Sequence, residues 1–313
     1  MSGVAAGLVR LGTRRSALAL AQARIVAARV ERCGYAVELV EVVTEGDRSA
    51  AALTQLGGTG VFVTELRGRL LDGAVDLAVH SLKDLPTRPA DGLTVAAIPT
   101  RADARDVLVA RDGLRLDQLP ARARVGTGSP RRTAQLRALG LGLDVVAIRG
   151  NVDTRLRKVA DGELDAVVLA AAGLSRLGRL DEATELLDPG QILPAPGQGA
   201  LAIECRADDT ALAAALADAL DDGATRAAVA AERSLLATLE AGCTAPVGAL
   251  ADVAQGETGE EEIYLRAVVA SIDGGRSVRM SATAPLADSE GLGRRLAAQM
   301  LDAGAADLIG ENP

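Results

Sequence analysis

Short apolar runs and amphipathic helical patterns alternate along most of the chain. The first apolar run, Leu8–Leu11, is followed by a basic turn and by a helical pattern over Ala17–Cys33 that ends at Gly34. Another helix is predicted over Val61–Asp72. The further predicted strands are Val37–Val43, Asp76–Val79, Leu93–Ile98, Val107–Ala110, Val145–Arg149, Asp165–Leu169 and Ala200–Cys205. Strands that alternate with helices are typical of α/β folds.

The pattern changes after the last of these strands. The elements predicted there are the alanine-rich helices Asp209–Leu220 and Thr225–Glu240, a hairpin of Ile263–Ser271 and Ser277–Thr283, and a helix over Ser289–Ala303. Crossing points between parts of the chain are predicted at Thr100–Arg105 and at the Pro- and Gly-rich Leu193–Gly199. We therefore predict a first α/β lobe of residues 1–99 plus about 200–220, a second of residues 100–199, and a small C-terminal α+β domain of residues 221–313.

The stretch Val125–Lys158 contains the most informative chemistry. Ser129 is a predicted helix N-cap, and Pro130 takes the first helical position. Arg131 and Arg132 then fall in the first turn, where the positive end of the helix dipole disfavours a cation. An external anion that binds both guanidinium groups would offset this cost. On this interpretation, replacing either arginine should not greatly destabilise the protein.

A second corner of the same kind follows. Gly150 and Asn151 form a predicted turn between a strand and a helix, and Arg149 and Arg155 flank that turn. A run of charges is usually a solvated surface, but two successive arginine-rich corners favour an anion site. The third glycine of a dinucleotide-binding fingerprint and the Gly-Lys-Ser/Thr of a P-loop are both missing. The favoured ligand is therefore a carboxylate, or several carboxylates.

Composition limits the classes of function. Aromatic residues make up 1% of the chain and the net charge is −8, which argues against nucleic-acid binding and requires any anion site to be a local basic pocket. The odd set of cysteines, Cys33, Cys205 and Cys243, has no metal-ligand spacing and suggests a reducing compartment. A signal peptide and an apolar run of ~18–20 residues are not evident, so we expect a cytoplasmic protein outside the membrane.

The heptapeptide His80–Pro86 follows a predicted strand, at the kind of position where α/β sheets bind ligands. His80, the only histidine, is interpreted first as a hydrogen-bonded structural residue. Lys83 and Asp84 have two open interpretations. They form an exposed ion pair of little energetic value, or they bind an anion and handle protons beside a cleft.

Five motifs in order resemble porphobilinogen deaminase, also called hydroxymethylbilane synthase. They are AVHSLKDLPT at Ala78–Thr87, VGTGSPRR at Val125–Arg132, IRGNVDTRL at Ile148–Leu156, LPAPGQGALAIECR at Leu193–Arg206 and LEAGCTAPVGA at Leu239–Ala249. The resemblance begins at Leu11–Arg14 and runs almost end to end. It implies two lobes like those of periplasmic binding proteins around a cleft, followed by a third domain with a cysteine loop.

The resemblance also implies a reaction and a cofactor. A dipyrromethane would be bound through a thioether to Cys243, and the enzyme would add four porphobilinogen units to it, each with loss of ammonia. Hydrolysis would then release hydroxymethylbilane for tetrapyrrole and heme biosynthesis. The implied partners are porphobilinogen and its polypyrrole intermediates, with no nucleic acid or membrane, and the implied state is a monomer.

Residue roles follow from the same resemblance. Asp84 and Lys83 are assigned to catalysis, because a fixed carboxylate stabilises the cationic azafulvene that remains when ammonia leaves. Each pyrrole carries an acetate and a propionate, which suit arginine forks. The implied cofactor contacts are Cys243, Lys83, Asp84, Ser129, Arg131, Arg132 and Arg155. The implied substrate contacts are Arg14, Ser16, Gln22, Ser81, Thr127, Arg149, Asn151, Arg176 and Gln198, and a metal is not implied.

One departure and two alternatives accompany this assignment. The loop Asp47–Gly60 often carries lysines in the family, whereas Gln55 and Thr59 stand in this chain. A two-lobed small-anion binding protein without catalysis predicts a secretory signal and leaves Cys243 without a role. A ligand-sensing regulator predicts a basic helix-turn-helix segment, which we do not find in a chain of net charge −8.

Overall fold

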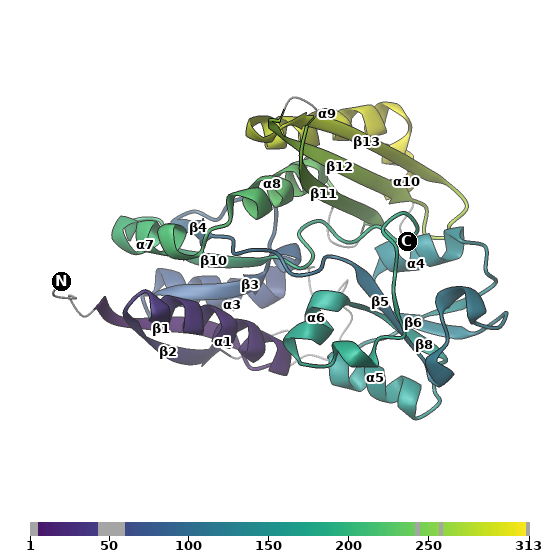
Figure 1. Ribbon diagram of the computed structural model, residues 1–313, viewed down its shortest axis with the longest axis horizontal. Helices are drawn as coiled ribbons and strands as arrows, with labels where there is room; N and C mark the ends of the chain where they lie inside the picture. The colour runs from purple at the N-terminus through teal and green to yellow at the C-terminus, as the bar shows by residue number, and fades with distance from the viewer. Residues whose placement is uncertain (1–5, 43–59, 242–244, 257–258, 311–313) are drawn as a thin grey trace. The chain divides into compact units, whose positions relative to one another are not determined.

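The protein divides into two compact units, Met1–Arg101 with Ala200–Arg226 and Ala102–Gly199 with Ala227–Pro313. The structure is a computed structural model that describes residues 6–42, 60–241, 245–256 and 259–310 (Figure 1). The first unit contains β1 (Ala6–Arg14), α1 (Ala17–Arg32), β2 (Tyr35–Val42), α3 (Gly60–Leu71), β3 (Leu77–Ser81), β4 (Leu93–Ala97), β10 (Leu201–Arg206) and α7 (Thr210–Leu220).

The first unit is built on a five-stranded sheet of order β2-β1-β3-β10-β4. Strand β1 runs parallel to β2 and β3, whereas β10 runs antiparallel to β3 and β4. Val26 of α1 and Leu216 of α7 pack in one core cluster with Leu11 of β1. Leu66 of α3 packs in another cluster with Ala78 of β3. Because successive side chains of a strand point to opposite faces, α1 and α7 cover one face and α3 covers the other.

The second unit repeats this arrangement. Its first part contains β5 (Asp106–Ala110), β6 (Arg124–Thr127), α4 (Pro130–Ala138), β7 (Asp144–Ala147), α5 (Val152–Ala160), β8 (Ala166–Ala170), α6 (Ala171–Arg176) and β9 (Glu185–Leu186). The sheet order is β7-β6-β8-β5-β9, with β6 parallel to β7 and β8 and with β5 antiparallel to β8 and β9. Leu136 of α4 packs on one face, and Leu156 of α5 packs on the other.

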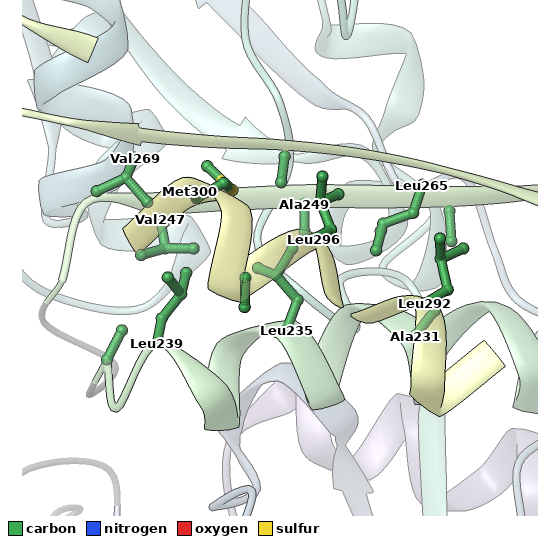
Figure 2. Close-up of a cluster of buried hydrophobic side chains, with 14 of the residues drawn as sticks. Ala231, Leu235, Leu239, Val247, Ala249, Leu265, Val269, Leu292, Leu296 and Met300 are labelled. Carbon is green, nitrogen blue, oxygen red and sulfur yellow. The ribbon is translucent and has the colours of Figure 1, made fainter. Parts of the chain in front are cut away.

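A separate antiparallel sheet completes the second unit. Its elements are β11 (Val247–Gln255), β12 (Glu261–Ala270), β13 (Ser277–Pro285), α9 (Ser289–Asp302), α10 (Ala305–Gly310) and most of α8 (Gly223–Thr238). Figure 2 shows Leu235 of α8 and Leu292 and Leu296 of α9 in the apolar cluster that covers this sheet. A Cβ atom on Gly293 would lie 2.3 Å from the Ala231 carbonyl oxygen, so glycine permits the close approach of α9 to α8.

The predicted fold class is confirmed in its main features. Two mixed sheets with helices and a small C-terminal α+β part are present, and β12 and β13 form the predicted hairpin. Strand β11 and helix α10 were not predicted, and β7 ends at Ala147 rather than at Arg149. The short 3-10 helices are η1 (Leu82–Asp84), η2 (Arg111–Gly113), η3 (Leu116–Gln118), η4 (Leu180–Glu182) and η5 (Leu286–Asp288). The exact boundaries of three domains stay a prediction.

Candidate functional site

In the first unit, two parallel strands bring polar turns to one edge of the sheet. Strand β1 pairs with β3 through Leu11 opposite Leu77, so both strands end at the same side. Ser16 follows β1 as the N-cap of α1, and its Oγ accepts a 3.3 Å bond from the Ala19 backbone N–H. The candidate residues collected at this edge are Arg14, Ser16, Ser81, Lys83 and Asp84.

Asp84 and Lys83 lie in the 3-10 turn η1 that directly follows β3. Both side chains are half-buried, and buried Leu82 and Leu85 flank them and hold the turn against the core. The buried Gln22 of α1 donates a 2.9 Å hydrogen bond from Nε2 to Ser81 Oγ. The end of β3 is thereby fixed to α1, which gives Asp84 a rigid base.

Behind this edge, His80 makes a structural contact. Its Nε2 lies 3.3 Å from Glu204 Oε2, and both side chains are buried. Arg67 donates to the same carboxylate, from Nε at 3.0 Å and from Nη2 at 2.8 Å. Burial would raise the pKa of Glu204, but the bonds from His80 and Arg67 outweigh burial and hold that pKa below its usual value. Interpreting His80 as a structural residue is therefore supported.

In the second unit, the two arginine-rich corners meet at the ends of β6 and β7. Thr127 lies opposite Ala147 in this parallel pair, so both turns emerge at one edge. Thr127 is buried, and its Oγ1 accepts a 3.2 Å bond from the Ser129 backbone N–H. Ser129 caps α4 as predicted, with Pro130 at its start, and Asn151 caps α5 through a 2.9 Å bond from the Thr154 N–H.

Arg131 and Arg132 have a counter-anion inside the protein. Asp106, which is 0% exposed, accepts a 2.8 Å bond from Arg131 Nη1 and a 2.7 Å bond from Arg132 Nη2. The external anion inferred from the sequence stays a prediction, and the structure adds an internal carboxylate, at the start of β5, that already compensates part of this positive charge. Burial would raise the pKa of Asp106, but the two positive charges outweigh burial and hold the pKa far below its usual range.

Each guanidinium nevertheless keeps a buried donor that is not used. Within the described part of the chain, the buried Nε–H groups of Arg131 and Arg132 have no hydrogen-bond partner. Their other ends are held, because Arg131 Nη1 also donates to the Leu193 carbonyl oxygen and Arg132 Nη1 donates 2.9 Å to that of Val168. Buried donors in native proteins are normally satisfied, so these two groups mark a place for an acceptor.

Arg155 and Arg149 add positive charge at the same corner. Arg155 Nε donates 2.9 Å to the Gly150 carbonyl oxygen, which curls the side chain over the turn. Burial lowers the pKa of Arg155, and the charges of Arg132 and Arg149 lower it further. A cation whose pKa is reduced by neighbouring cations lies in a field that favours an anionic ligand.

The remaining candidates lie close to the crossing at residue 199. Arg176, at the end of α6, donates 2.6 Å from Nη2 to the Gly199 carbonyl oxygen, and burial lowers its pKa to about 10. Gln198 is 1% exposed, and its Nε2 donates 2.7 Å to the Ala104 carbonyl oxygen and 2.7 Å to Asp106 Oδ1. In this geometry Gln198 therefore helps to hold the Asp106 carboxylate in place.

Sequence reasoning did not identify Asp106, Glu204 or Arg67. Asp106 offered one usable signal, an acidic residue at the start of a wholly apolar strand. The predicted anchor Cys243 and the loop residues Gln55 and Thr59 lie outside the described residues. Of the other cysteines, Cys33 is exposed, whereas burial raises the pKa of the Cys205 thiol to about 11.

The described ranges also bear on two other kinds of site. Among those residues, His, Cys, Asp and Glu side chains do not gather into a group of three or more that could hold a metal ion. Of the helices in those ranges, none has the length and apolar character needed to cross a membrane.

Comparison with known proteins gives matches over nearly the whole chain. The model of the porphobilinogen deaminase dipyrromethane cofactor binding domain matches residues 9–214, and that of the porphobilinogen deaminase C-terminal domain matches residues 226–302. Porphobilinogen deaminase 1 of Streptomyces coelicolor is 60% identical over 97% of this chain and 98% of its own length. The porphobilinogen deaminase of Mycobacterium tuberculosis is 55% identical over 96% of this chain and 98% of its own.

A comparison of structures gives more distant matches. The methionine-binding protein MetQ matches 68% of this chain and 89% of its own, with 14% identity and a TM-score of 0.42. The VFT2 domain of Bordetella pertussis BvgS matches 68% of this chain and 86% of its own, with 19% identity and a TM-score of 0.41.

Proposed function

The chain belongs to the porphobilinogen deaminase family, and we propose that the two polar edges described above bind the cofactor and substrate of that reaction. The family condenses four porphobilinogen molecules head to tail on an enzyme-bound dipyrromethane, releasing ammonia and then hydroxymethylbilane. The observation that carries the function is the match of both family domains over most of the chain. The proposed roles of individual residues rest on the geometry.

The arginines of the second unit suit a ligand that carries several carboxylates. The unpartnered buried Nε–H groups of Arg131 and Arg132 are donors that a carboxylate would satisfy. Arg155 lies in the positive field of Arg132 and Arg149, which an acidic ligand would relieve. When bound, the dipyrromethane supplies the pyrrole carbon that is extended. We assign Ser129, Arg131, Arg132 and Arg155 to its carboxylates, and Thr127, Arg149, Asn151 and Arg176 to substrate.

The polar edge of the first unit suits the stabilisation of a cation that develops on the substrate. Asp84 is placed by a short turn between buried leucines, so its carboxylate does not need to reorganise when a cation develops on the substrate. Loss of ammonia from porphobilinogen produces such a cation, and the carboxylate of Asp84 stabilises it or accepts a pyrrole N–H bond. Lys83 binds a carboxylate, and Arg14, Ser16, Gln22 and Ser81 contact or orient substrate.

Cys243 is the proposed covalent anchor. Attachment requires a soft nucleophile that attacks the azafulvene carbon. A thiolate does this far better than an alcohol near neutral pH, and the bond that it forms is a thioether. Cys205 is a poor candidate, because burial keeps its thiol protonated at neutral pH. We also propose that the protein is a cytoplasmic monomer that does not bind nucleic acid, in keeping with its net charge of −8.

Replacement of Asp84 tests the proposed chemistry. Asp84→Ala should lower porphobilinogen consumption and ammonia release by ~10²–10³ while the cofactor stays attached. Asp91→Ala, which removes an exposed acid from the same unit, should leave both rates unchanged. Near-normal turnover in Asp84→Ala would remove this residue from catalysis. A wild-type protein that binds porphobilinogen but releases no ammonia would favour the alternative of an anion-binding protein without catalysis.

A further inference from the structure

Asp106 lies at the centre of a buried charged cluster in the second unit. Its Oδ2 accepts from Arg131, and its Oδ1 accepts from Arg132 and from Gln198. The exposed fractions of Arg131 and Arg132 are 4% and 5%. One carboxylate thus faces two guanidinium groups and one amide, and the cluster keeps a single net positive charge.

Without Asp106, electrostatic repulsion would favour separation of the two guanidinium groups. Two cations that contact one buried carboxylate repel each other, and this repulsion is stronger in a medium of low dielectric than in water. Each would gain by rotating toward water, and both sit in the first turn of α4, where the helix dipole adds to the repulsion. The carboxylate accepts from Arg131 Nη1 and Arg132 Nη2. The Leu193 carbonyl oxygen accepts from the same Arg131 Nη1, and the Val168 carbonyl oxygen accepts from Arg132 Nη1.

This arrangement determines which N–H groups of the two arginines stay available for a ligand. With Arg131 Nη1 and both Nη groups of Arg132 bonded inside the unit, the Nε–H groups of these two arginines stay unused, as do the buried His80 Nε2 and Arg266 Nε elsewhere among the described residues. A guanidinium held on one side presents its remaining donor in a fixed direction, so less side-chain entropy is lost when a carboxylate binds.

We propose that Asp106 is a positioning residue, which pre-orients Arg131 and Arg132 to receive carboxylates of the dipyrromethane and which Gln198 keeps in place. This inference rests on the proposed function of the arginine pair. Gln198 donates to Asp106 Oδ1, the oxygen that also accepts from Arg132, and to the Ala104 carbonyl oxygen, so it ties the acid to the chain just before β5. Because Asp106 is 0% exposed, we place it behind the two arginines and not among the groups that touch substrate.

The test compares cofactor occupancy in folded protein. Asp106→Asn keeps the shape of the side chain and removes its charge. The intact mass of the purified full-length chain should show dipyrromethane occupancy, or its rate of assembly from added porphobilinogen, reduced on the order of tenfold or more. Asp76→Asn is the matched control, because Asp76 also pairs with two arginines, Arg10 and Arg206, but in the first unit. That control should lose stability and keep full occupancy.

Three further results decide the proposal. Full occupancy in Asp106→Asn, together with loss of the cofactor in Arg131→Leu, would overturn the role of Asp106 and leave the proposed function intact. Full occupancy in Arg131→Leu would instead contradict the assignment of the arginine pair. If Asp106→Asn does not fold, Asp106→Glu keeps the charge and displaces the two forks, so assembly should still be slowed. A wild-type rate of assembly in Asp106→Glu would overturn the proposal.

Discussion

A Cβ atom on Gly128 would lie 2.7 Å from the carbonyl oxygen of Ile148. The turn that follows β6 therefore packs directly against the chain that leaves β7, with no room for a side chain. The same Cβ atom would lie 3.7 Å from Arg155 Nη2. This contact brings the capped start of α4 and the arginine-rich turn before α5 together at one edge.

Gly128→Ala should consequently separate the two corners. A backbone oxygen cannot rotate away as a side chain can, so the turn must shift, at a cost of roughly 1–3 kcal/mol in the free energy of unfolding. We expect kcat/KM for porphobilinogen to fall by more than this stability loss explains, because Ser129 and Arg155 move apart. Gly68→Ala is the control, since a Cβ atom there meets nothing within 4 Å. Equal kinetics for the two variants would contradict the importance of this contact.

Replacement of Arg131 should reduce both stability and cofactor content. The sequence alone led us to expect little destabilisation, but the structure changes that expectation, because Arg131→Leu removes a partner from the buried Asp106. Removing one member of a buried pair costs roughly 3–5 kcal/mol, and the lower end applies since Arg132 and Gln198 remain. Urea unfolding and intact mass measure the two effects. Arg157→Leu, at an exposed position on α5, should change neither. An Arg131→Leu protein as stable as wild type would contradict the buried pairing.

The cluster of Glu204 predicts an acid-dependent loss of stability. The pKa of Glu204 lies below its usual value of 4.5 in the folded protein, so its contribution is fully present above about 4.5 and is lost as pH falls through the lower, folded value. We expect the difference in unfolding free energy between wild type and Glu204→Gln to be largest near neutral pH and to shrink in acid. Urea unfolding between neutral pH and about pH 3 measures this difference. Parallel pH profiles for the two proteins would show that Glu204 does not titrate differently on folding.

Local chemistry in the sequence was sufficient to predict the two arginine-rich corners. Ser129 and Pro130 specify the start of α4 through capping and a fixed φ, which depend on neighbouring residues alone. Parallel strands then explain why Thr127 and Arg149, or Ser16 and Ser81, share an edge.

The partners of buried charges could not be predicted in the same way. Asp106 meets Arg132 across 26 positions, and Glu204 meets Arg67 across 137, and no local pattern marks either pair. Strand β11 was missed because its Gly- and Ala-rich start is buried without the alternation that identifies a half-exposed strand. Tertiary packing decides these features.

We propose that this chain carries a dipyrromethane on Cys243. Intact mass spectrometry of the purified protein, followed by peptide mapping, tests it most directly. We predict that the wild-type mass exceeds that of the sequence by one two-pyrrole adduct, located on the peptide that contains Cys243. Cys243→Ala should lose the adduct and the activity, whereas Cys33→Ala and Cys205→Ala should keep the adduct. An active enzyme with unmodified mass, or an adduct mapped to Cys33 or Cys205, would contradict the claim.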